Sequence, residues 1–126
     1  MIDRKTIQPA DDIRAGRTSW REYMLPEAVK TKIIEKIKEV SSPIRIFLFG
    51  SYAYGVPDSA SDIDIMVIEK SVASKVAESN RLLMALKDIP FPKDIIVASQ
   101  DEFDFYKKEA GSIFRTVAEK GVVLYG

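Results

Sequence analysis

The feature that most constrains this sequence is a Gly50-Ser51 pair followed, after ten further residues, by Asp62-Ile63-Asp64. Apolar runs flank the pattern at residues 44–49 and 63–68, and their length and composition are typical of strands. Because side chains alternate along a strand, Asp62 and Asp64 point to one face and Ile63 to the other. The Cα atoms of the two aspartates are then about 6–7 Å apart.

Two carboxylates side by side on a half-buried strand repel each other and resist the loss of water. A divalent cation relieves both problems, and Mg²⁺ prefers carboxylate and phosphate oxygens. Gly50 allows a tight turn after the first strand, and Ser51 can cap a short helix over residues 52–54. Since the N-terminus of a helix attracts anions, the whole pattern predicts a site for a metal ion and a triphosphate.

Residues 50–55, Gly-Ser-Tyr-Ala-Tyr-Gly, and 61–67, Ser-Asp-Ile-Asp-Ile-Met-Val, resemble the minimal nucleotidyltransferase (MNT) branch of the polymerase-β-type nucleotidyltransferase superfamily. The resemblance extends over about residues 44–125. It implies Mg²⁺-dependent transfer of a nucleoside monophosphate, with AMP from ATP favoured, to a hydroxyl acceptor. In this interpretation Asp62 and Asp64 hold the metal, and Gly50 and Ser51 cradle the triphosphate.

The resemblance also implies a third carboxylate on a neighbouring strand. Asp94, at the head of the apolar run 95–97, occupies the matching position. It would bind the metal and help to activate the incoming hydroxyl, because the sequence contains no histidine that could act as a base. Turn chemistry explains the other candidate acids: Asp58, Asp88 and Asp101.

Two tyrosines, Tyr52 and Tyr54, lie next to the motif and could stack on a nucleobase, although packing in the core is the favoured alternative. Three basic residues could contact phosphate, although a solvated helix face is favoured for them: Lys70, Lys75 and Arg81.

Composition narrows the possibilities. A chain of 126 residues predicts one domain, and 46% of the residues are apolar. The 19 basic and 19 acidic residues balance and form no basic stripe, so a nucleic-acid partner is not expected. The absence of cysteine excludes disulfides and thiolate metal sites. With no apolar leader and no run of membrane-spanning length, we expect a cytoplasmic protein without a membrane partner.

We expect an N-terminal arm over residues 1–25, in which Trp20 and Tyr23 pack on the domain or on a partner. The nucleotidyltransferase domain then spans 26–126. Its pattern predicts helices over 26–40, from Ser71 or Ser74 to Asp88, over 101–108 and from 113 to Gly121, with strands over 44–49, 62–69, 94–99 and 122–125. The fold class is α/β (α+β): a small mixed sheet with helices mainly on one face, nucleotidyltransferase-like.

The length leaves no room for a separate acceptor-binding domain, so a partner is expected to present the acceptor. The resemblance implies a small helical partner of the HEPN type, with the MNT member acting as an antitoxin that adenylylates a tyrosine of the toxin. Two alternatives stay open. One is an antitoxin that only binds and has a vestigial site. The other is a small-molecule nucleotidyltransferase, as in aminoglycoside modification, whose acceptor cleft would need a homo-oligomer.

Overall fold

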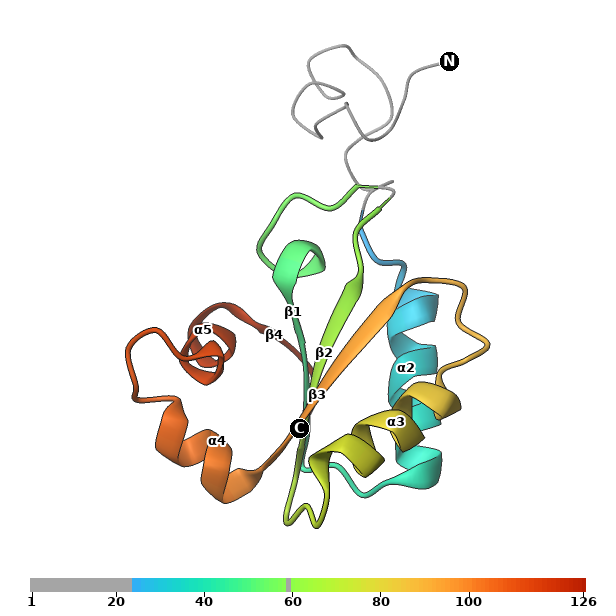
Figure 1. Cartoon of the computed structure of the whole chain (residues 1–126). Helices are drawn as coiled ribbons and strands as arrows, with labels where there is room; N and C mark the ends of the chain where they lie inside the picture. Colours follow the sequence, from blue (N-terminus) through green and yellow to red (C-terminus); the bar gives the residue numbers. More distant parts are fainter. Residues whose placement is uncertain (1–23, 59) are drawn as a thin grey trace.

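The computed structural model describes residues 24–58 and 60–126 (Figure 1). In chain order the elements are α2 (Glu27–Val40), β1 (Arg45–Phe49), the 3-10 turn η2 (Gly50–Tyr52), β2 (Ile63–Glu69), α3 (Lys75–Ala85), β3 (Lys93–Ser99), α4 (Gln100–Tyr106), α5 (Ile113–Lys120) and β4 (Val122–Tyr125). Each expected helix and strand is present within a few residues of its predicted bounds. Trp20 and Tyr23 of the N-terminal arm lie outside the described residues.

The four strands form one sheet in the order β3-β2-β1-β4. β1 runs antiparallel to β2 and to β4, whereas β2 and β3 run parallel. A parallel pair needs a crossover connection, and α3 supplies it between β2 and β3. The predicted mixed sheet is therefore confirmed.

Alternating side chains divide the core into two clusters, one on each face of the sheet. Ile46 and Leu48 of β1 pack in the larger cluster, with buried residues of α2 and α3. Phe47 and Phe49 pack in the smaller cluster, where α4 and α5 contribute Phe103 and Val117. The two long helices thus cover one face of the sheet, and the two short helices cover the other face (Figure 1).

Serine hydroxyls begin three of the helices. Ser74, Ser99 and Ser112 each accept a hydrogen bond from the backbone N–H three residues later, which satisfies an otherwise free donor of the first turn. Helical spacing predicts that Val76 of α3 faces the core together with Leu82 and Leu86. This prediction is wrong for Val76, which is 73% exposed. Within the described residues, no helix combines the length and the apolar character needed to cross a membrane.

Candidate functional site

Three strand ends bring the predicted carboxylates to one end of the sheet. The parallel register of β2 and β3 places Asp64 directly beside Asp94. The antiparallel register of β1 and β2 places Phe49, the residue before Gly50, beside Asp64. Asp62 immediately precedes β2 and lies in an exposed position. Residues that are far apart in the sequence therefore meet at the site that the motif predicts.

Gly50 touches the Asp64 carboxylate so closely that no side chain fits at this position. A Cβ atom added to Gly50 would lie 2.1 Å from Asp64 Oδ2, and the Gly50 backbone has a φ of +73°. Both facts require glycine, since other residues disfavour that backbone conformation. A second close approach occurs at Gly55, where an added Cβ would lie 2.8 Å from Ser51 Cα. The turn thus packs its bare backbone against the acidic strand.

Electrostatics at this end of the sheet are unfavourable for the carboxylates alone. Burial raises the pKa of Asp64 above its ordinary value, and the charges of Asp94 and then Asp62 raise it further. The ion pairs of the described residues do not involve any of these three aspartates. In the described part of the chain, a half-buried carboxylate therefore faces like charges and has no ion-pair partner.

The donor chemistry of this cluster fits Mg²⁺. Carboxylate oxygens are hard ligands, and Mg²⁺ commonly takes only one or two protein carboxylates and completes its shell with water and substrate phosphates. Asp64 and Asp94 supply such an adjacent pair. In the described part of the chain, no three His, Cys, Asp or Glu side chains come close enough to form a metal cage on their own. The arrangement thus suits an ion that is shared with a phosphate ligand.

The 3-10 turn differs from the expectation for Ser51. The turn begins at Gly50, two residues earlier than predicted, and it has no side-chain cap. The Gly50 carbonyl instead accepts hydrogen bonds from the N–H groups of Ala53 and Tyr54, both at 3.0 Å. The prediction that Ser51 caps this helix is therefore wrong, because the glycine backbone already initiates the turn.

Two residues beside the motif have different surroundings. Tyr52 is partly buried and packs against the larger core cluster, which confirms core packing, whereas Tyr54 is 42% exposed. Burial raises the pKa of Tyr52, and the charges of Asp58 and Asp62 raise it further. The sequence pattern did not predict that Tyr52 lies near Asp62. The position of Tyr52 two residues after Gly50 was the only indication that it belongs to this site.

The rival acids have local roles. Asp58 Oδ1 accepts hydrogen bonds from the Ala60 N–H at 2.8 Å and from Ser61 Oγ at 3.4 Å, so it organises the loop before Asp62. Asp101 lies in the first turn of α4, where a negative charge favours a helix. Lys93, next to Asp94, donates from Nζ to the carbonyls of Ile89 and Phe91, both at 2.8 Å.

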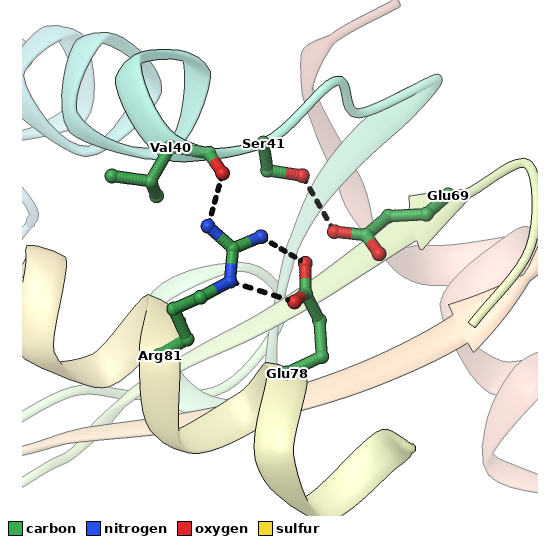
Figure 2. A network of polar contacts seen from close by, with 5 residues as sticks. All are labelled: Val40, Ser41, Glu69, Glu78 and Arg81. Atoms are coloured by element: carbon green, nitrogen blue, oxygen red, sulfur yellow. Dashed lines mark hydrogen bonds and ion pairs between the residues drawn. The ribbon is translucent and has the colours of Figure 1, made fainter. Parts of the chain in front are cut away.

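The basic candidates for phosphate contact are used elsewhere. Arg81 binds Glu78 and the carbonyl of Val40, and Lys75 pairs with Glu102 (Figure 2 shows the Arg81 contacts). Arg81 and Lys70 line a polar cavity of about 570 Å³ that also contains Glu69, the last residue of β2. Asp64 lies five residues before Glu69, or about 17 Å along a strand, so this cavity is separate from the aspartate site.

Comparison with known proteins identifies the domain. The model of the family described as "Nucleotidyltransferase domain" matches residues 30–123. None of the curated proteins matches the sequence significantly.

Several solved structures have a similar fold. One is described as a toxin-antitoxin with AMP-PNP; it is 24% identical with a TM-score of 0.51, over 77% of this chain and 73% of that chain. Another is a tri-AMPylated HEPN toxin of Shewanella oneidensis in complex with MNT antitoxin, 22% identical with a TM-score of 0.47, over 79% and 71% of the two chains. A third is the toxin-antitoxin MntA-HepT, 22% identical with a TM-score of 0.48, over 80% and 73%.

The family match includes both the Gly50 turn and the strands that carry Asp64 and Asp94. This chain therefore belongs to the nucleotidyltransferase domain family, as its sequence motifs indicate.

Proposed function

We propose that this protein transfers AMP from ATP, in the presence of Mg²⁺, to a hydroxyl group of a helical partner protein. The observation that carries the proposal is the in-register Asp64–Asp94 pair, with the bare backbone of Gly50 against the Asp64 carboxylate. The family match supports nucleotidyl transfer in general. The labelling experiment below tests the nucleotide, the metal and the acceptor.

Asp64 and Asp94, with Asp62 immediately before β2, would hold Mg²⁺ together with the ATP phosphates, because the carboxylates do not form a complete cage on their own. The bound ion would offset the negative charge of the phosphates. Asp94 is exposed at the edge strand, so its free carboxylate oxygens can also accept the proton of an approaching hydroxyl. The proposed attack forms a bond between the hydroxyl oxygen and the α-phosphorus, and pyrophosphate leaves. Positioning and charge stabilisation carry this chemistry, so a protein nucleophile is not required.

Gly50 and Ser51 would lie along the triphosphate. Because Gly50 lacks a side chain, the backbone of the turn can approach both the Asp64 carboxylate and a phosphate group closely. Gly55 allows a second close approach, to the Ser51 backbone. This arrangement explains why small residues occur at these positions of the turn.

A similar fold supports the choice of nucleotide and partner. One of the similar structures is described as a toxin-antitoxin with AMP-PNP, which is an analogue of ATP. We therefore propose that the present chain is the antitoxin of a pair of this kind, with a HEPN-type toxin as the acceptor. A cytoplasmic location follows from that role and is part of the proposal.

The test is co-purification of the full chain from its native host, followed by incubation with Mg²⁺ and α-labelled ATP. We expect label on a hydroxyl of a co-purified helical protein, located by mass analysis. Asp64→Asn should abolish labelling, whereas Asp88→Asn, at an exposed acid just after α3, should leave it unchanged. A stable complex without label would favour an antitoxin that only binds. Label on a low-mass acceptor without a complex would favour a small-molecule enzyme.

A further inference from the structure

Glu69 is the buried charged residue of the described chain. Its side chain ends β2 and is 8% exposed, in a position where glutamate is rarely found without a partner. The residue lies at the end of β2 opposite Asp64, so the proposed transfer reaction gives it no role. Its burial therefore calls for a separate explanation.

Side chains from the end of α2 and the start of α3 converge on Glu69 (Figure 2). Ser41, which follows α2, donates a hydrogen bond from Oγ to Glu69 Oε2 at 2.6 Å. The carboxyl group of Glu78, in the first turn of α3, faces Glu69. Two facing carboxyl groups repel each other when both are ionised, and a proton on one of them removes the repulsion.

Arg81 determines which of the two glutamates stays ionised. Its Nε donates to Glu78 Oε1 at 2.9 Å, and its Nη2 donates to Glu78 Oε2 at 2.8 Å. This paired contact stabilises the Glu78 carboxylate. Arg81 also donates to the carbonyl of Val40, the last residue of α2, which ties α3 to α2. The proton consequently belongs on Glu69.

The surrounding charges agree with this assignment. Burial and then the adjacent Glu78 carboxyl group raise the pKa of Glu69 to about 7, against the opposing effects of Ser41 and Arg81. The pKa of Glu78 is lowered, first by the neighbouring Glu69 and then by Arg81. The other charged residues around the adjoining cavity are Lys38, Glu39 and Lys70, all of them exposed.

We propose that Glu69 is a protonation-dependent clamp that joins the end of β2 to α2 and α3. With its proton, Glu69 accepts the hydrogen bond from Ser41 and lies against Glu78 without repulsion, which closes this corner of the domain. Without the proton, two carboxylates face each other beside a cavity of about 570 Å³, and repulsion loosens the contact between β2 and α3. The clamp responds to pH in the physiological range and is independent of the proposed transfer chemistry.

The sign of the effect follows from proton linkage. The folded state keeps a proton on Glu69 up to a pKa of about 7, whereas an unfolded glutamate releases it near 4.5. Between these values the folded state binds more protons, so the stability decreases as pH rises through this window and levels off above it. A glutamine at position 69 retains the hydrogen-bonding shape and cannot ionise, so its stability should lack this decrease.

The experiment combines a direct titration with a matched pair of variants, all in EDTA. Carbon-13 NMR of the parent protein should show the Glu69 carboxyl titrating about 2 pH units or more above an ordinary glutamate. Between pH 5 and pH 8 the Tm of the parent should fall by several degrees more than that of Glu69→Gln. Glu39→Gln, at an exposed acid of the same cavity, should follow the parent curve. Glu78→Gln should move the Glu69 titration to lower pH.

Two results would overturn the proposal. One is a Glu69 carboxyl that titrates near 4.5, the ordinary value for glutamate. The other is a Tm curve of Glu69→Gln that runs parallel to the parent curve throughout this pH range. If Glu69→Gln does not fold, the NMR titrations of the parent and of Glu78→Gln decide the question by themselves.

Discussion

Replacing Gly50 with alanine tests the contact at the centre of the proposed site. The new Cβ would lie 2.1 Å from Asp64 Oδ2, and the residue would have to keep a φ of +73°. The backbone conformation costs about 1–2 kcal/mol for an L-residue. Moving the Asp64 side chain off its preferred rotamer costs about 0.5–1.5 kcal/mol more. We therefore expect Gly50→Ala to lower the free energy of unfolding by about 1.5–3.5 kcal/mol.

The chain offers a matched control for the backbone part of this cost. Gly111 has a φ of +83°, but no atom lies within 4 Å of its added Cβ. Gly111→Ala should therefore show only the conformational cost of about 1–2 kcal/mol. The difference between the two variants measures the Gly50–Asp64 contact. Urea denaturation monitored by circular dichroism gives both free energies, and the loss of entropy in the unfolded chain is common to both.

Gly50→Ala made together with Asp64→Ala tests whether the Asp64 carboxylate causes the extra cost. In Asp64→Ala the carboxylate is absent, so adding Gly50→Ala should cost no more than Gly111→Ala does. Gly50→Ala alone should also weaken Mg²⁺-dependent ATP binding, because the displaced Asp64 carboxylate no longer lies beside Asp94. Equal destabilisation by the two glycine variants, together with unchanged ATP binding in Gly50→Ala, would refute this account of the turn.

Two further predictions concern the acidic pair and the core. Without metal, Asp62→Asn/Asp64→Asn should melt at or above the parent temperature. The variant removes charges that burial and mutual repulsion disfavour, which are the causes of the raised pKa of Asp64. A Tm well below that of the parent would show that these acids are structural. Leu82→Ala, at a fully buried position of α3, should lower the free energy of unfolding by about 2–5 kcal/mol. Val76→Ala, at an exposed position of the same helix, should change it by less than about 0.5 kcal/mol. Comparable losses for the two variants in urea denaturation would contradict the observed burial.

The order of helices and strands was predictable from local patterns. Apolar runs, turn residues and serine caps act within a few residues, so they indicated β2 and a start of α3 at Ser71 or Ser74 without knowledge of the fold; Ser74 is the residue that caps the helix. The side-chain alternation around Asp62 and Asp64 also follows from strand geometry alone. These predictions succeeded because short-range steric and hydrogen-bonding rules decide them.

Other features depend on contacts between distant segments. Helical spacing shows which side of α3 faces the core, but not where along the axis the core ends, so Val76 was wrongly placed inside. The register that sets Asp94 beside Asp64 depends on how β3 pairs with β2. The burial of Glu69 depends on Glu78 and Ser41, which lie on two other elements. Sequence patterns carry no direct signal for such pairings.

Calorimetry of ATP binding tests the central claim most directly. The account places Mg²⁺ and the triphosphate of ATP together between the Gly50 turn and the aspartates. ATP should therefore bind the parent protein in the presence of Mg²⁺, EDTA should abolish the binding heat, and Asp64→Asn should show no Mg²⁺-dependent binding. ATP affinity that stays the same after chelation, or that survives in Asp64→Asn, would contradict the account.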